Sequence, residues 1–260
     1  MSRYSDMFSR LAAHREGAFG AFLMLGDPDL ETSSRLLDDL AEGGADMIEV
    51  GMPFSDPVAD GPVIQAAADR ALRAGVTPSH CFELLADFRA RNSDVPVGIL
   101  TYANLVVARG LDRFCADAAA SGVDSLLVAD VPSLEAEPFA GAARAAGLDF
   151  VMIAAPNTAA DALARIARLA SGYTYCVARP GVTGTRDRLD LDHGDLFGAL
   201  HSLGAPPPVL GFGISTPDHV RQALQAGAAG VISGSAIVQL AGAGQSCRPF
   251  VAEMKSATRM

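Results

Sequence analysis

Two acidic residues in one short stretch, IEVGMPFSDPVADGP at residues 48–62, are the strongest candidates for chemistry in this sequence. Glu49 lies near the end of an apolar run whose length and composition suit a buried parallel strand. An ionised carboxylate at such a position is costly unless it has a partner or a chemical task. Asp60 ends the Pro-, Ser- and Gly-rich loop that follows, just before a long helical pattern. Glu49 and Asp60 are therefore the predicted catalytic pair, since carboxyl groups can donate and accept protons.

Each acid also has a purely structural interpretation. Glu49 could pair with a neighbouring arginine or backbone amide, because structural ion pairs are common. Asp60 could cap the helix that is predicted to begin near Pro62. The residue types alone leave both alternatives open.

The composition indicates a globular protein with a large core. Of the 260 residues, 50% are hydrophobic and 19% are charged, which argues against disorder. The net charge is −10, and no basic run stands out, so nucleic acid is a poor candidate partner. The N-terminus lacks the apolar core of a signal peptide, and no apolar run approaches the ~18 residues that span a bilayer. We therefore expect a cytoplasmic protein without membrane association.

Strand-like apolar runs alternate with helical patterns along the whole chain. The apolar runs lie near residues 18–25, 46–50, 96–100, 124–129, 149–154, 173–178, 208–211 and 229–232. The helical patterns cover residues 30–41, 62–73, 78–91, 111–120, 134–145, 159–169, 194–202, 217–226 and 247–256. Such alternation predicts an α/β fold with a parallel sheet, and eight units predict a single (β/α)₈ TIM barrel over residues 1–260. A doubly wound open sheet is the alternative.

The first dozen residues predict an extra helix outside this alternation. Tyr4, Met7, Phe8 and Leu11 recur at helical spacing and form one apolar face. Such a helix would cap the closed end of the barrel.

The loops after the late strands predict a phosphate site. Gly211-Phe212-Gly213 follows the seventh predicted strand, and Ser233-Gly234-Ser235 follows the eighth. Glycine lets backbone amides approach an anion closely, and a helix N-terminus favours negative charge. Barrels often build a phosphate site in these two loops. Residues 179–193, after the sixth strand, are polar and aperiodic and are interpreted as a lid.

The remaining side chains restrict the chemistry. Seven residues near strand ends could line an apolar pocket for a flat ring: Phe22, Leu100, Leu127, Ala129, Ile153, Tyr175 and Phe212. The only lysine, Lys255, lies in the last helical pattern, which excludes Schiff-base aldol chemistry at a strand end. Four scattered cysteines and five dispersed histidines show no metal-binding spacing, so no metal is expected. Carbon–carbon cleavage here would therefore depend on carboxylates and on an electron-rich heteroaromatic substrate.

At this point the sequence resembles the α-subunit family of tryptophan synthase. The matching segments are GDPDLETS at 26–33, IEVGMPFSDPVADGPVIQAA at 48–67, YANLV at 102–106, VDSLLVADVP at 123–132, RPGVTG at 179–184, GFGIST at 211–216 and ISGSAIV at 232–238. The resemblance extends from about Tyr4 to the C-terminal helix. It implies a TIM-barrel lyase of tryptophan biosynthesis that cleaves indole-3-glycerol phosphate to indole and glyceraldehyde 3-phosphate by a retro-aldol reaction.

The resemblance also implies individual roles. Glu49 matches the general acid/base and Asp60 the acid that hydrogen-bonds the indole N–H. Phosphate would be held by Gly184, Gly213, Gly234 and Ser235, and Thr183 would close on Asp60. Phe22, Leu100, Tyr175 and Phe212 would pack around the indole or position Glu49. The family needs no metal or cofactor on this subunit.

A partner is implied as well. In the family, indole passes through a tunnel to a β subunit that carries pyridoxal phosphate, within an α2β2 complex. The residues that resemble the loops facing this partner are Pro53, Phe54, Ser55, Asp56, Asp130 and Pro132.

The sequence departs from the common family pattern at Ala21, Met24 and Thr101, which affects the expected shape of the pocket.

Three alternative functions stay open: a stand-alone lyase of the same ancestry, a non-catalytic regulatory subunit, and a phosphate-binding barrel isomerase of histidine biosynthesis. The intact acid pair disfavours the second, and the match at 48–67 disfavours the third.

Overall fold

A computed structural model describes residues 2–177 and 194–259 of the chain. Within these residues it contains twelve helices and nine strands. The helices are α1 (Arg3–His14), α2 (Leu30–Glu42), α3 (Pro62–Arg73), α4 (Pro78–Arg91), α5 (Ala103–Arg109), α6 (Leu111–Ala120), α7 (Glu137–Ala145), α8 (Ala160–Leu169), α9 (Gly194–Ser202), α10 (Pro217–Gln225), α11 (Ser235–Gly242) and α12 (Arg248–Ser256). The strands are β1 (Ala18–Met24), β2 (Met47–Gly51), β3 (Val97–Thr101), β4 (Ser125–Val128), β5 (Asp149–Phe150), β6 (Met152–Ala154), β7 (Thr174–Val177), β8 (Pro208–Gly211) and β9 (Gly230–Ser233).

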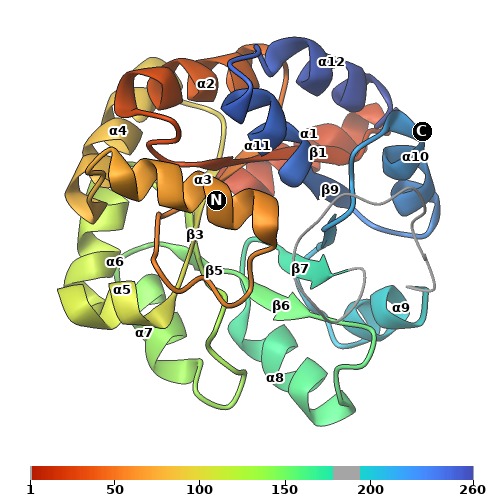
Figure 1. The fold of residues 1–260 in the computed structure, drawn as a ribbon. Coiled ribbons are helices and arrows are strands. Elements are labelled where there is room, and N and C mark those ends of the chain that lie inside the picture. The colour runs from red at the N-terminus through yellow and green to blue at the C-terminus, as the bar shows by residue number, and fades with distance from the viewer. Residues whose placement is uncertain (1, 178–193, 260) are drawn as a thin grey trace.

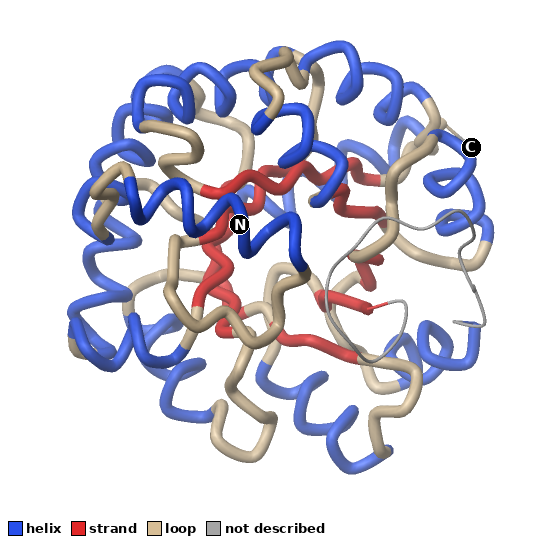
Figure 2. Tube along the Cα trace, viewed as in Figure 1, coloured by secondary structure: helices blue, strands red, loops and turns tan. Residues whose placement is uncertain are grey.

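All nine strands belong to one parallel sheet that closes into a barrel. The order β5-β4-β3-β2-β1-β9-β8-β7-β6 places β5 and β6 at its two ends, yet only Val151 separates them in the chain. Val151 itself donates its N–H to the Leu126 carbonyl at 2.9 Å. The strands therefore form a ring, with the helices around it (Figures 1 and 2). The TIM barrel is confirmed, and an open doubly wound sheet is excluded.

Most predicted elements coincide with those observed. Helices α3 and α4 begin and end where the pattern predicted, each starting with a proline in its first turn. The strand expected over residues 149–154 is divided into β5 and β6. Helix α5 was not predicted, because its seven residues are too few to establish a helical period.

Helix α1 covers the end of the barrel at which the strands begin. Its buried residues Tyr4, Met7 and Leu11 belong to the apolar cluster that fills the barrel interior. The Tyr4 ring lies 5.3 Å from that of Tyr173, and its hydroxyl is 3.0 Å from Ser125 Oγ. The predicted capping helix is therefore present, and the opposite end of the barrel remains available for a ligand.

The alternation of side chains along the strands builds two apolar layers. On β1, Phe22 and Met24 point into the barrel interior, while Phe19 and Leu23 pack outward against the surrounding helices.

In the described part of the chain, no helix is long and apolar enough to cross a membrane.

Candidate active site

Glu49 is buried inside the barrel on β2. Its side chain reaches the interior because β2 alternates, with Ile48 and Val50 packing outward. The residue is 3% exposed, and its Oε1 accepts a hydrogen bond of 3.0 Å from the Tyr173 hydroxyl. Burial raises the pKa of Glu49 to about 8; the hydrogen bond from Tyr173 opposes this shift, and the nearby Asp60 charge adds to it. Glu49 therefore holds a proton near neutral pH, as a general acid must.

Asp60 lies beside Glu49 at the end of the loop that leaves β2. It is 4% exposed, and burial raises its pKa to about 6 against the opposing hydrogen bond from the Tyr102 hydroxyl. The N-cap of α3 is Gly61, which makes no side-chain capping bond, so the capping interpretation of Asp60 is wrong. Near neutral pH, Asp60 is ionised while Glu49 is protonated. The two acids are thus held in different protonation states.

The loop after β2 holds Asp60 in place through its backbone. The Asp60 N–H bonds the Pro57 carbonyl at 3.0 Å, and the Asp60 carbonyl accepts a bond of 2.7 Å from Gln65 Nε2 on α3. The loop therefore returns its last residue to the mouth of the barrel from which β2 emerges.

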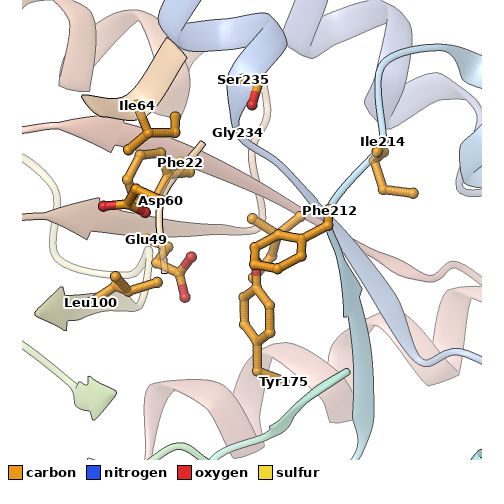
Figure 3. A pocket seen from close by; sticks show the side chains of 12 residues that line it. Phe22, Glu49, Asp60, Ile64, Leu100, Tyr175, Phe212, Ile214, Gly234 and Ser235 are labelled. Atoms are coloured by element: carbon orange, nitrogen blue, oxygen red, sulfur yellow. The ribbon is translucent and has the colours of Figure 1, made fainter. Parts of the chain in front are cut away.

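A cavity of about 450 Å³, partly open to solvent, contains both carboxyl groups. It is lined by Phe22, Glu49, Asp60, Ile64, Leu100, Tyr175, Phe212, Gly213, Ile214, Ile232, Gly234 and Ser235. In Figure 3 the two acids lie on one side, and the rings of Tyr175 and Phe212 face them across the space. These two rings meet edge to face, with 5.9 Å between their centroids. The cavity therefore offers an apolar slot for a flat ring between two carboxyl groups and two aromatic side chains.

Not every predicted ring-binding residue reaches this cavity. Leu127 belongs to the interior cluster, and Ala129 and Ile153 pack against it, but none of the three lines the cavity. Ala129 and Ile153 instead line a second cavity, which also involves Pro132. Thr183 and Gly184 lie outside the described residues.

The three remaining phosphate candidates lie together at one part of the cavity. Gly213, Gly234 and Ser235 all line it, from the turns after β8 and β9. Phe212 and Gly213 have φ values of 71° and 75°, a left-handed backbone that is uncommon for phenylalanine and that concentrates at functional sites. Ser233 Oγ donates a bond of 2.6 Å to the Ile214 carbonyl and joins the two turns. The start of α11 at Ser235 adds backbone amides that favour an anion.

The predicted partner-facing residues flank the same mouth of the barrel. Phe54 is half-buried, Ser55 and Asp56 are exposed, and Pro53 is buried. Asp130 and Pro132, which follow β4, are exposed. Both segments leave the C-terminal ends of strands, so they lie at the end of the barrel where the acids are.

Two functional tyrosines were missed by the sequence analysis. Tyr173 precedes β7 and bonds Glu49, and Tyr102 follows β3 and bonds Asp60. The only signal was their position beside predicted strand ends, which does not separate them from tyrosines of the core.

The three departures from the family pattern are all buried. Ala21 packs in the outer layer, and Met24 lies in the interior cluster. The Thr101 hydroxyl is buried without a hydrogen-bond partner in the described part of the chain. None of the three lines the cavity.

The described residues contain no group of three His, Cys, Asp or Glu side chains that could hold a metal ion. Among the described residues, the polar groups of the site are two carboxyl groups, tyrosine hydroxyls, the Ser235 hydroxyl and backbone amides. Such a set can exchange protons with a ring and bind an anion at a distance from it.

The chain is similar over its whole length to one family of known proteins. A family model described as tryptophan synthase alpha chain matches residues 8–259. The tryptophan synthase alpha chain of Shewanella amazonensis is 49% identical over 99% of this chain and 100% of its own length. That of Cronobacter sakazakii is 49% identical over 99% of both chains. Among solved structures, one of Mycobacterium tuberculosis tryptophan synthase has a TM-score of 0.91 and 30% identity and covers 100% of this chain and 99% of its own. One from Aquifex aeolicus has a TM-score of 0.92 and 35% identity and covers 100% of both chains.

Proposed function

Because the chain belongs to the tryptophan synthase alpha chain family, it is a carbon–carbon lyase, and we propose that Glu49 and Asp60 perform its chemistry. The reaction is the retro-aldol cleavage of indole-3-glycerol phosphate to indole and D-glyceraldehyde 3-phosphate in tryptophan biosynthesis. The observation that supports the proposal is a single cavity that holds two carboxyl groups with raised and separated pKa values.

Glu49 is the general acid/base of this proposal. Its carboxyl proton moves to C3 of the indole ring, which leaves positive charge on the ring nitrogen. The bond between C3 and the glycerol carbon then breaks, and its electron pair returns to the ring as the glycerol hydroxyl becomes the aldehyde. Glu49, now ionised, takes up the hydroxyl proton and regains its starting state. Its pKa of about 8 supports both directions of transfer near neutral pH.

Asp60 is the electrostatic partner in this mechanism. An ionised carboxylate hydrogen-bonded to the indole N–H stabilises the positive charge that develops when C3 is protonated. With its pKa of about 6, Asp60 is ionised at neutral pH, and its burial makes the interaction stronger than in water.

The remaining cavity residues bind the substrate. Phe22, Leu100, Tyr175 and Phe212 pack on the indole ring, an assignment supported by their position around the carboxyl groups. Gly213, Gly234 and Ser235 hold the phosphate through backbone amides and the serine hydroxyl. Thr183 and Gly184, which lie outside the described residues, complete the lid and the phosphate site in this proposal. Leu127, Ala129 and Ile153 do not line the cavity, so in this proposal they support its apolar wall from the interior cluster rather than contact the indole.

The chain works with the β subunit of tryptophan synthase, which receives the indole. We assign the contact with this partner to Pro53, Phe54, Ser55, Asp56, Asp130 and Pro132. Pyridoxal phosphate belongs to the β subunit in this proposal, and the α reaction proceeds on the carboxyl groups of this chain alone. We further propose that residues 1–260 act as one domain in the cytoplasm, where the four buried free thiols stay reduced.

The experiment that tests this function is indole release from indole-3-glycerol phosphate by the purified chain, alone and with a tryptophan synthase β subunit. Slow release that rises strongly with the partner supports a subunit of the biosynthetic complex. Fast release that the partner does not change would indicate a stand-alone lyase. No release under either condition would refute the proposed chemistry.

A further inference from the structure

Both partner-facing segments meet at the start of helix α5. The Phe54 ring stacks on that of Tyr102, with 5.3 Å between the centroids and 28° between the planes. The Asp130 carboxylate accepts a hydrogen bond of 2.8 Å from the N–H of Ala103, the first residue of α5. One segment therefore contacts the Tyr102 side chain, and the other holds the backbone directly after it.

The hydroxyl end of Tyr102 contacts the segment that carries Asp60. Its hydroxyl accepts a bond of 3.3 Å from the N–H of Ala59 and donates to the Asp60 carboxylate. Tyr102 is 2% exposed and Asp60 is 4% exposed, so neither hydroxyl nor carboxylate can readily exchange this partner for water. The carbonyl of Tyr102 accepts a bond of 3.1 Å from the Leu105 N–H in the first turn of α5. The Tyr102 backbone is thus the N-cap of α5 and is tied to its first turn.

We propose that Tyr102 is a positioning residue that transmits docking of the β subunit at Phe54 and Asp130 to the carboxylate of Asp60. A partner that presses on the Phe54 ring, or that engages the Asp130 side chain, changes how firmly the tyrosine hydroxyl is held against Asp60. The substrate ring nitrogen then meets a carboxylate that is better oriented. This inference rests on the proposed role of Asp60 and deepens it.

The electrostatics around Asp60 give the inference a signature in pH. The titratable groups that face Asp60 in the described residues are Glu49 on β2, Tyr175 on β7 and Tyr102 itself, and Asp130 faces Tyr102. A hydroxyl bond stabilises the ionised carboxylate, so it lowers the pKa of Asp60. Removing the hydroxyl should raise that pKa, and the acid limb of the activity profile should move to higher pH.

Tyr102→Phe is the decisive variant, because it keeps the stacked ring and removes only the hydroxyl. We expect kcat for indole release to fall about 10-fold with a smaller change in KM, as for the loss of one hydrogen bond to a charged group. The acid limb should move to higher pH in the same variant. If both kcat and the acid limb of the pH–activity profile equal those of the wild type, the inference is overturned. In that case Tyr102 would act only through the packing of its ring, which the phenylalanine keeps.

Phe54→Leu tests the link to the partner. This variant removes the stacking and should lower the stimulation by the β subunit severalfold at saturating partner. Phe82→Leu is the control, because Phe82 also loses a ring contact, its edge-to-face pair with Phe114 at 5.4 Å between centroids, and does not line the cavity. A smaller loss of stimulation in the control supports the inference, and an equal loss in both variants would contradict it.

A double variant and a reference variant complete the test. If Phe54 acts through Tyr102, then Phe54→Leu should lower the stimulation by the β subunit less in the Tyr102→Phe background than in the wild type. Fully additive effects of the two substitutions would overturn the inference.

Asp60→Asn distinguishes this inference from the proposed function. If it is inactive while Tyr102→Phe is unaffected, only this inference fails; if it is fully active, the proposed role of Asp60 fails first.

Discussion

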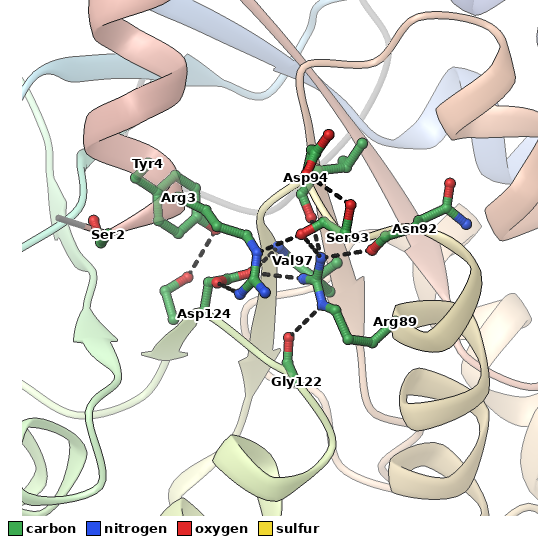
Figure 4. Close-up of polar contacts among 12 residues, drawn as sticks. Ser2, Arg3, Tyr4, Arg89, Asn92, Ser93, Asp94, Val97, Gly122 and Asp124 are labelled. Atoms are coloured by element: carbon green, nitrogen blue, oxygen red, sulfur yellow. Dashed lines mark hydrogen bonds and ion pairs between the residues drawn. The ribbon is translucent and has the colours of Figure 1, made fainter.

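The carboxylates of Asp124 at the closed end of the barrel and of Glu49 and Asp60 at the open end have different kinds of partner, although Asp27 at the open end also pairs with an arginine, Arg70, at 2.7 Å. At the closed end, Asp124 pairs with Arg3 at 2.7 Å and Arg89 at 2.8 Å and accepts a bond of 2.8 Å from the Val97 N–H (Figure 4). At the open end, the described residues give Glu49 and Asp60 tyrosine hydroxyls as partners. A cation offsets the cost of burying a carboxylate far better than a hydroxyl does.

Asp46 repeats the arrangement of the closed end. Its carboxylate lies 2.9 Å from Lys255 Nζ and accepts a bond of 2.9 Å from the Phe19 N–H. Lys255 also pairs with Glu16 at 2.9 Å, which ties the C-terminal helix to the segment before β1. Asp124 and Asp46 therefore join chain segments through charge pairs, whereas Glu49 and Asp60 have no cation as partner among the described contacts and can change protonation state. Four predictions test this difference.

Replacement of Glu49 by Gln should have the largest effect. The amide keeps the shape of the side chain and can still accept from Tyr173, but it can neither give nor take the proton. We expect kcat for indole formation to fall about 1000-fold while substrate binding is largely kept. Steady-state kinetics and equilibrium binding measure the two quantities. Turnover within about tenfold of the wild type would remove Glu49 from the mechanism.

Asp124→Asn should damage the fold and spare the chemistry. Arg89, with a side chain only 13% exposed, would lose its counterion, at a cost of about 3 kcal/mol in the free energy of unfolding. Denaturant unfolding measures this cost, and kcat per folded molecule should stay close to that of the wild type. A stable variant with strongly reduced kcat would show that the closed end takes part in the reaction.

Asp60→Asn should reduce kcat about 100-fold, which is less than the loss for Glu49→Gln, because stabilisation of developing charge is lost while proton transfer remains possible. The pH profile sharpens the test. Wild-type activity should rise through about pH 6, as Asp60 ionises, and fall above about pH 8, as Glu49 loses its proton. The Asn variant should lack the acid limb and keep the alkaline one. An unchanged acid limb would assign it to another group.

The last prediction concerns the pH dependence of stability. Glu49 has a pKa of about 8 in the folded chain against 4.5 as its ordinary value, so between these pH values the folded state holds a proton that the unfolded state has lost. The contribution of Glu49 to stability therefore falls as pH rises from 4.5 to 8. Glu49→Gln removes this dependence, and its Tm advantage over the wild type should grow across that window by on the order of 10 °C, because raising the pKa from 4.5 to about 8 corresponds to about 5 kcal/mol. Thermal unfolding at several pH values measures it. A difference that does not vary with pH would mean that burial of this carboxyl group costs nothing.

Local patterns in the sequence were sufficient for most of the architecture. Period and length predicted the helices at 62–73 and 78–91, and an apolar face predicted α1. Such patterns did not predict the interruption of the strand at Val151, between β5 and β6, or the short helix α5. The first follows from closure of the ring, and the second is too short to have a period.

Some residues of the site could likewise be located from the sequence, and others could not. The acids, the glycine turns and four of the ring-binding residues could be located from residue type and position at strand ends. Tyr173 could not be assigned, because it bonds a glutamate 124 positions away, and sequence spacing does not indicate which strands face each other across a barrel. Tyr102 was missed because a buried phenol beside a strand looks like core until its hydroxyl partner is known.

The sequence by itself determined which residue types were available: one acid near the end of a buried strand and one in the loop after it, glycine-rich turns after two late strands, and an alternation that predicts a parallel sheet. The tertiary structure decided what those acids can do. A pKa depends on how much water is excluded and on which groups approach from other strands, and both arise only when the barrel closes. Asp124 and Asp46, which pair with arginine and lysine, therefore stabilise the fold, whereas burial gives Glu49 and Asp60 pKa values of about 8 and about 6.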